Sequence, residues 1–348
     1  MDAERTGICL VGCGRVAKSH LAGAKQAKDS VRVAALVSRD AKKGEQYAAC
    51  CGDVPVFATL EEAAARCAFE AVDLCVPNDL HCEYALRSAA LGKHILVEKP
   101  MANTPADCVR MEDAAKRAGV TLMSGQSRRY YPAVLRSYEM AESGRWGALR
   151  CISAQLLGYL PGPPTPWWRD AARTGGLMLP LWGNHIFDYI LWMFGEMPQT
   201  VYCVATRLNP AWEGEDEVAA TLSFAGGRFA CVRMSWNTRG GRGEWEGTER
   251  MLSSADILYQ RQIQLDHGTL MLDDETRLVC DGETVFVDEE KESNFARMLR
   301  EFASAIRQGR PPLTDAAAGR RAVAVQEACL RSAAENRLMR LTREETYV

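Results

Sequence analysis

The chain has 348 residues, 47% of them hydrophobic and 25% charged, and its formal net charge at pH 7 is −3. This length suits about two domains, each with its own core. Without a surplus of basic residues we expect no nucleic-acid partner. No apolar run approaches the roughly 18 residues of a membrane span. No apolar signal segment precedes the first predicted strand, so we expect a cytoplasmic protein with no membrane partner.

Thirteen cysteines are scattered along the chain without a C-x-x-C pair. Several of them, including Cys9 and Cys75, lie inside apolar strand patterns, which favours buried, reduced thiols. The ligand spacings of zinc modules are absent, so we expect no metal site.

A strand, a glycine turn and a helix open the chain. An apolar run over residues 8–11 breaks at two glycines before a helical pattern resumes. A G-x-G-x-x-A turn lets the backbone approach a pyrophosphate, which the helix N-terminus attracts. The alternative is a tight turn with no ligand. The cofactor-binding residues predicted here are Gly12, Cys13, Gly14, Arg15 and Val16.

The second predicted strand, Val31–Val37, ends at Ser38 and Arg39, where NAD sites usually place an acidic side chain. A hydroxyl and a guanidinium suit a 2′-phosphate better than a bare ribose. We therefore predict Ser38 and Arg39 as cofactor-binding residues and NADP as the preferred cofactor, with NAD as the alternative. A solvated helix start, or a ribose contact from Asp40, stays open.

Helices and strands alternate through the rest of the first third. They are predicted at Ala41–Ala49, Val54–Phe57, Leu60–Arg66, Val72–Val76, Leu80–Leu91 and His94–Val97. This alternation indicates a doubly wound parallel sheet, and such sheets bind ligands at the carboxyl ends of their strands. The further cofactor-binding residues predicted at these ends are Pro77, Asn78, His81, Glu98 and Lys99.

Several segments together resemble the Gfo/Idh/MocA oxidoreductases, the group that includes glucose–fructose oxidoreductase and inositol dehydrogenase. The most specific matches are Glu98-Lys99-Pro100 and Gly183-x-His185-x-x-Asp188. The resemblance spans nearly the whole chain, and the matching segments are Gly12–His20, Val76–His81, Gly92–Pro100, Arg129–Pro132, Trp168–Arg169, Gly175–Gly176, Gly183–Asp188 and Glu327–Asn336.

The resemblance implies an α/β fold in two domains. Residues 1–124 would form an N-terminal Rossmann NAD(P)-binding domain. Residues 125–348 would form an α/β domain with a large, mostly antiparallel sheet for substrate binding and oligomerisation. The helix over residues 316–337 would pack back on the first domain.

The second part of the chain agrees with this expectation. Strand-like runs dominate it, at Cys151–Leu157, Val201–Thr206, Glu217–Phe224, Phe229–Trp236, Gln262–Leu265, Thr269–Leu272 and Thr284–Val287. An apolar helix is predicted at Leu181–Phe194 and an amphipathic one at Phe295–Arg307. Two of the predicted strands, Val201–Thr206 and Phe229–Trp236, are too apolar for a sheet face that is fully open to water. We therefore expect a homodimer or homotetramer that forms through this sheet.

Two residues are the predicted catalytic groups. Oxidising a secondary alcohol needs a hydride acceptor and a base. A partly desolvated Lys99 should have a depressed pKa, and the resemblance makes it the catalytic lysine before a cis Pro100. His185 carries an imidazole, a group that can act as a base or an acid near physiological pH, and it shares a helix face with Asp188, interpreted as an orienting or structural carboxylate. The alternatives are an exposed lysine after a strand and a core histidine.

One position departs from the family pattern. Many members carry an aspartate four residues before the histidine, and here that residue is Leu181. The change predicts a more apolar pocket, suited to an aryl glycoside or a less polar sugar derivative. The predicted substrate-contacting residues, for which ordinary packing is the alternative, are Arg129, Tyr130, Trp168, Arg169, Leu181, Asn184 and His185.

The leading expectation is an NAD(P)-dependent dehydrogenase that transfers hydride between a secondary alcohol of a sugar, polyol or glycoside and the nicotinamide. One alternative is a glycosidase or lyase of the same fold that oxidises its sugar transiently and retains the cofactor. A second is a non-catalytic NAD(P)-sensing protein, although retention of both Lys99 and His185 argues against it. His20, His81 and His94 are interpreted mainly as structural residues.

Overall fold

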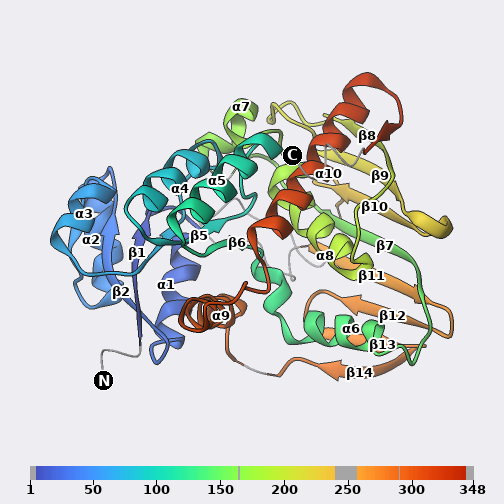
Figure 1. The fold of residues 1–348 in the computed structure, drawn as a ribbon. Helices are drawn as coiled ribbons and strands as arrows, with labels where there is room; N and C mark the ends of the chain where they lie inside the picture. Colours follow the sequence, from blue (N-terminus) through green and yellow to red (C-terminus); the bar gives the residue numbers. More distant parts are fainter. Residues whose placement is uncertain (1–4, 164, 240–256, 290, 342–348) are drawn as a thin grey trace. The chain divides into compact units, whose positions relative to one another are not determined.

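The computed structural model describes residues 5–163, 165–239, 257–289 and 291–341 (Figure 1). These residues form two compact units. The first unit runs to Ala102 and includes Ala106–Tyr130 and Lys291–Arg320, and the other described residues form the second. Among the described helices, none is long and apolar enough to cross a membrane.

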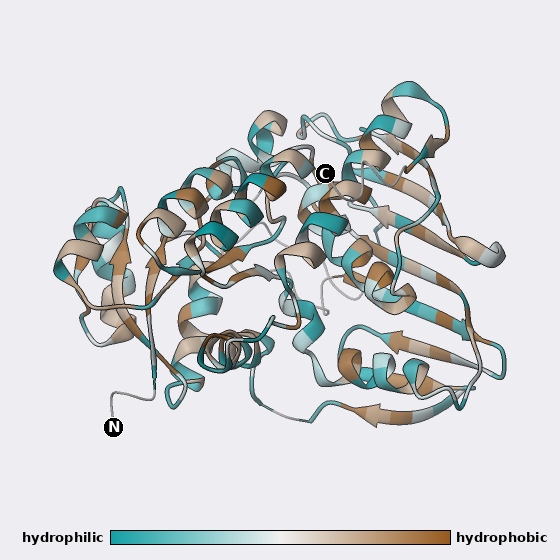
Figure 2. Ribbon diagram, in the orientation of Figure 1, coloured by the Kyte–Doolittle hydropathy of each residue, from teal (hydrophilic) through white to brown (hydrophobic). Residues whose placement is uncertain are grey.

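A six-stranded parallel sheet forms the centre of the first unit, in the order β3-β2-β1-β4-β5-β6. This confirms the predicted doubly wound parallel sheet. Its central strands are buried on both faces, and in Figure 2 they are mainly brown, whereas the surrounding helices carry both brown and teal residues. The strands are β1 (Thr6–Val11), β2 (Val31–Val37), β3 (Val56–Phe57), β4 (Ala71–Leu74), β5 (His94–Glu98) and β6 (Leu122–Gly125).

The first four helices of this unit follow the predicted alternation with strands, whereas α5 and strand β6 were not among the predicted elements. Asp40 and Thr59 accept backbone hydrogen bonds at the starts of two of them, as N-cap residues do. The helices are α1 (Ala17–Gln26), α2 (Ala41–Ala48), α3 (Leu60–Arg66), α4 (His81–Ala90), α5 (Pro105–Ala118) and α9 (Asn294–Gln308).

Helix α9, predicted as part of the second domain, belongs to the first unit instead. Its buried face, including Leu299 and Phe302, shares one apolar cluster with Ile8 of β1 and Leu96 of β5. An amphipathic pattern shows that a helix covers an apolar surface, but not which surface it covers. Helix α10 (Ala316–Glu335) begins in the first unit and continues in the second from Arg321.

A nine-stranded sheet dominates the second unit, in the order β14-β13-β12-β11-β7-β10-β9-β8-β15. All neighbours are antiparallel except β7 and β10, which confirms the predicted large, mostly antiparallel sheet. The short strands β13 and β15 were missing from the predicted strands. The strands are β7 (Leu149–Gly158), β8 (Thr200–Thr206), β9 (Glu217–Ser223), β10 (Phe229–Ser235), β11 (Ile257–Leu265), β12 (Gly268–Asp273), β13 (Arg277–Cys280), β14 (Glu283–Val287) and β15 (Met339–Arg340).

Helices cover one face of this sheet. Helix α6 (Pro132–Glu142) contacts β12, β13 and β14, and α8 (Asn184–Phe194) contacts β7 (Figure 1). In α10, the Ser332 hydroxyl accepts a hydrogen bond from the Cys203 amide of β8. Side chains alternate along the strands, so the opposite face carries the exposed Tyr202, Val204 and Phe229.

Candidate functional site

The turn after β1 is shaped for close approach of a ligand. Gly12 has a φ of 99°, and a Cβ there would lie 2.7 Å from the Cys75 carbonyl oxygen, so only glycine fits. A Cβ on Gly14 would meet only that same oxygen, at 3.6 Å, which leaves open space on its other sides. No side chain caps the start of α1. The geometry fits a phosphate group held at the helix N-terminus.

The end of β2 carries the residues predicted to choose the cofactor. Ser38 is buried, and its hydroxyl donates to the Asp40 carbonyl oxygen at 2.7 Å. Arg39 is exposed. The Asp40 carboxylate accepts a hydrogen bond from the Lys43 amide at 3.1 Å and so caps α2. A ribose contact from Asp40 would compete with this cap.

Lys99 follows β5 directly and is half-buried. Burial lowers the pKa of its ammonium to about 8; the Glu98 carboxylate opposes this shift, and the nearby Arg128 and Arg15 add to it. The Lys99–Pro100 bond is cis, as expected. A lysine with this pKa can gain or lose its proton close to neutral pH.

A buried chain of charged groups lies next to Lys99. His20 of α1 places Nδ1 2.8 Å from Oδ2 of Asp73 and Nε2 3.0 Å from Oε1 of Glu98. Burial disfavours the charged ring, but Asp73 outweighs it and raises the pKa of His20 well above its usual value. Burial likewise opposes ionisation of Glu98, yet hydrogen bonding to His20 leaves the pKa of Glu98 below its usual value. The imidazolium therefore donates to both carboxylates.

The same region contains the one group of metal-ligand types found among the described residues. Side-chain atoms of His20, Asp73 and Cys75 lie within 4.8 Å of one another. Burial raises the pKa of the Cys75 thiol to about 12, so it stays protonated. Both ring nitrogens of His20 are hydrogen-bonded. The group is better described as a hydrogen-bonded network than as a set of metal ligands.

The end of β4 is linked to the residue after Lys99 by His81. One ring nitrogen of this buried histidine lies 2.8 Å from the Pro100 carbonyl oxygen, and the other lies 2.9 Å from that of Val76. Burial lowers the pKa of His81. Pro77 and the buried Asn78 form the turn between these contacts. His81 thus ties together the backbone at two strand ends.

Two residues predicted to contact substrate lie inside the first unit. Tyr130 is 3% exposed, and its hydroxyl lies 3.0 Å from the Thr314 hydroxyl. Arg129 is also buried and donates to the Leu313 carbonyl oxygen at 3.3 Å. Both side chains hold the loop before α10, which accounts for their burial without a substrate.

The second unit carries His185 in the first turn of α8. The side chain is buried, as are Asn184 and Asp188 on the same helix. Asn184 donates to Oε1 of Gln326 in α10 at 3.3 Å. The indole of Trp182 meets the imidazole edge-on, with 6.4 Å between ring centroids. The helix predicted from Leu181 begins later in the structure. Leu179–Gly183 forms a π-helical turn, and α8 begins after it at Asn184.

The side chains around this turn are mainly apolar. Leu181 is 4% exposed. Trp168 is half-buried and stacks on Trp236, with ring centroids 6.0 Å apart, whereas Arg169 is exposed. The apolar substrate pocket expected from Leu181 stays a prediction.

Glu215 is a positioning residue that the sequence patterns did not reveal. Its carboxylate accepts hydrogen bonds from the amides of Leu177, at 3.0 Å, and Leu179, at 2.9 Å, and so holds the start of the π-helical turn. Burial raises the pKa of this carboxyl. The partners lie 36–38 residues apart in the chain, which is too far for a capping motif to be visible.

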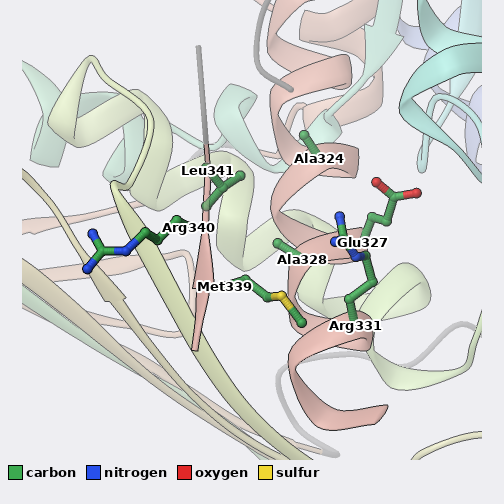
Figure 3. A pocket seen from close by; sticks show the side chains of 7 residues that line it. All are labelled: Ala324, Glu327, Ala328, Arg331, Met339, Arg340 and Leu341. Atoms are coloured by element: carbon green, nitrogen blue, oxygen red, sulfur yellow. The ribbon is translucent and has the colours of Figure 1, made fainter. Parts of the chain in front are cut away.

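Two cavities in the described residues include none of the predicted site residues. One, of about 30 Å³, lies between α10 and β15 and is lined by the side chains in Figure 3. It has room for little more than a water molecule. The other, of about 390 Å³, is a groove beside α1 whose lining includes Lys25, Lys28 and Arg32.

Comparison with known proteins identifies both parts of the chain. Residues 6–126 match the oxidoreductase family with an NAD-binding Rossmann fold, and residues 134–253 match the Gfo/Idh/MocA C-terminal domain. The chain belongs to the Gfo/Idh/MocA oxidoreductase family. It is therefore an NAD-binding oxidoreductase, as the motifs around the glycine turn and Lys99 predict.

The relatives of this Gfo/Idh/MocA protein carry the names of different enzyme activities. A 4-carboxy-2-hydroxymuconate-6-semialdehyde dehydrogenase from Sphingobium sp. is 26% identical, over 88% of this chain and 91% of its own. A 1,5-anhydro-D-fructose reductase from Ensifer adhaerens is 28% identical, over 76% and 78%. The crystal structure of aldose-aldose oxidoreductase from Caulobacter crescentus covers 97% of this chain and 100% of its own, with 24% identity and a TM-score of 0.84, and shows the same fold.

The structure brings most of the predicted cofactor residues of this oxidoreductase to one edge of the first sheet. Gly12, Ser38, Pro77 and Glu98 each follow or end a parallel strand, so their strand ends share that edge. The predicted substrate residues are divided: Arg129 and Tyr130 lie in the first unit, and the others lie in the second.

Proposed function

We propose that this protein is an NAD(P)-dependent dehydrogenase that transfers hydride between a secondary alcohol of a sugar, polyol or glycoside and the nicotinamide. The observation that carries the proposal is Lys99, whose pKa is lowered by burial to about 8, at the carboxyl end of a parallel strand in an NAD-binding sheet. The family membership and the reductase and dehydrogenase names of its relatives support it.

The bound nicotinamide would accept or donate the hydride. Lys99 takes the hydroxyl proton during alcohol oxidation as a neutral amine and returns it during reduction as an ammonium. Because its pKa is about 8, kcat/KM for oxidation should rise with pH through that value, and kcat/KM for reduction should fall. His185 would be the second proton-exchanging group, with Asp188 as an orienting carboxylate.

Ser38 and Arg39 support NADP(H) as the preferred cofactor, because a hydroxyl and an exposed guanidinium follow β2 where an NAD site usually has a carboxylate. Calorimetric titration of both cofactors tests this. Arg39→Ala should weaken NADP(H) binding roughly tenfold and leave NAD(H) binding nearly unchanged. The exposed Arg110 on α5 offers a control, Arg110→Ala. Tighter binding of NAD(H) to the wild-type protein would refute the NADP preference.

The substrate would be a less polar sugar derivative, such as an aryl glycoside. Leu181 and Trp182 replace polar surface with apolar surface beside His185, and Trp168 offers an indole face. Arg169 is exposed and could reach a hydroxyl or carboxylate of the substrate.

The exposed face of the nine-stranded sheet supports a homodimer or homotetramer. Tyr202, Val204 and Phe229 are each 40% exposed or more, on two strands of that face. Light scattering at micromolar concentration should show an assembly, and Phe229→Glu should dissociate it. A monomeric wild-type protein would contradict the proposal.

A panel of sugars, polyols and glycosides, followed at the absorbance of reduced nicotinamide, tests the function itself. Net reduction of free cofactor by one substrate class is expected. Conversion of a glycoside without net redox would instead identify a hydrolase or lyase that retains its cofactor. Cofactor binding without any conversion would identify a sensor.

A further inference from the structure

The buried charged groups next to Lys99 have no part in the proton transfer described above, although three elements of the fold contribute one group each. His20 comes from α1, Asp73 from β4 and Glu98 from β5, and all three side chains are buried. Burying three charged groups is costly unless each is compensated, so their arrangement calls for an explanation.

Glu98 connects the buried charged groups to Lys99. Its Oε1 accepts a hydrogen bond from His20 Nε2 at 3.0 Å, and its Oε2 accepts one from the backbone amide of Lys99 at 3.1 Å. His20 thereby fixes the orientation of the carboxylate that holds the Lys99 backbone. It also places one positive charge against the two negative charges of Asp73 and Glu98.

We propose that His20, held between Asp73 and Glu98, is a positioning residue that sets the pH range in which Lys99 exchanges its proton. The importance of this role for turnover depends on the proposed function, in which Lys99 is the catalytic group. The role itself concerns the ionisation of Lys99 and can be measured without any substrate.

The charged and titratable groups around the two residues determine the sign of the effect. Lys99 is acted on by Glu98, Arg128 and Arg15. His20 faces Asp73, Glu98 and the Cys75 thiol, while the Phe295 ring from α9 packs on it with 4.9 Å between ring centroids. His81 also acts on Glu98.

Removing the positive charge of His20 leaves two uncompensated carboxylates, which favour the ammonium form of Lys99. The proton-exchange midpoint of Lys99 should then rise. Removing the charge of Glu98 instead leaves His20 and Asp73 as a neutral pair, and the midpoint should fall. Opposite shifts from two neighbouring substitutions are an outcome that simple loss of packing would not produce.

Competitive acetylation of the full-length protein between pH 6 and 11, read by mass spectrometry, measures the midpoint directly, because only the neutral amine reacts. His20→Gln should raise the Lys99 midpoint by about one pH unit, and Glu98→Gln should lower it by about one unit. His20→Lys keeps a positive charge between the carboxylates and should restore a midpoint near that of the wild type. The control His94→Gln, at the far end of β5, should leave it unchanged.

An unchanged or lower midpoint in His20→Gln would overturn the inference. If His20→Gln does not fold, nitrogen NMR of the wild-type ring decides. Two protonated ring nitrogens at pH 8 support the charged role of His20, and a neutral ring overturns it.

The activity assay separates this inference from the proposed function. The pH profile of kcat/KM should move with the acetylation midpoint in each variant. If the midpoints shift as expected while the wild type oxidises no substrate, the ionisation inference stands and the proposed function fails. If the wild type oxidises a substrate but the midpoints do not shift, the proposed function stands and the ionisation inference fails.

Discussion

Lys99 and His185 have contrasting surroundings. Lys99 follows a parallel strand beside a buried cluster of two carboxylates and an imidazolium, and burial lowers its pKa to about 8. His185 lies on an apolar helix, next to Trp182 and after a turn that carries Leu181. The side chains around Lys99 are charged, whereas those next to His185 are mainly apolar.

The largest expected effect comes from removing the charge-controlled group. Lys99→Met should lower turnover by roughly 10²–10⁴, the usual contribution of a positioned acid–base group. Methionine fills a similar volume, so cofactor binding measured by calorimetry should persist. Lys93→Met is the control. Lys93 precedes β5, at the opposite end of that strand from Lys99, and its ammonium donates a hydrogen bond to the Phe69 carbonyl oxygen. Near-normal single-turnover hydride transfer in Lys99→Met would exclude Lys99 as the catalytic group.

His185→Ala tests the apolar site. Turnover should fall by about 10², and the loss should be less than additive with Lys99→Met if both groups serve one proton transfer. His267→Ala, in the exposed turn between β11 and β12, provides a histidine control. Strictly additive losses would show that the two groups act in separate steps.

Leu181→Asp gives the apolar site a carboxylate of the kind found beside Lys99. We expect the free energy of unfolding to fall by about 2–3 kcal/mol, because a buried carboxylate is costly. Activity should move toward more polar, unsubstituted sugars. Chemical denaturation and the substrate panel measure the two effects, and Leu181→Asn controls for size. An unchanged substrate preference would show that Leu181 does not shape the pocket.

Glu215→Gln should have the smallest effect, lowering the free energy of unfolding by about 1–2 kcal/mol. The carboxylate accepts from the Leu177 amide through both oxygens and from the Leu179 amide through Oε1, whereas an amide group can accept through only one atom. Burial raises the pKa of Glu215, so its protonation as pH falls should weaken the same contacts. Glu213→Gln, on an exposed side chain two residues away, should change little.

Local patterns predicted the parts of the structure that local chemistry determines. The glycine turn, the strand ends with Ser38 and Lys99, and the helix with His185 all carry short motifs or clear periodicity. The partners of these residues were not predictable in the same way. Asp73 lies within an otherwise apolar strand, and Glu215 acts on a turn more than 30 residues earlier. Helix α9 has a clear apolar face, but only the fold shows which sheet it covers.

The pairing of β7 has a consequence for the way the chain is made. This strand lies at the centre of its sheet, yet its partners are β10, beginning at Phe229, and β11, beginning at Ile257. During synthesis β7 therefore leaves the ribosome long before either neighbour exists, with both of its edges open to other chains. Contacts this distant in sequence form slowly. A nascent chain that stops before Ile257 accordingly lacks the β11 partner for one edge of β7.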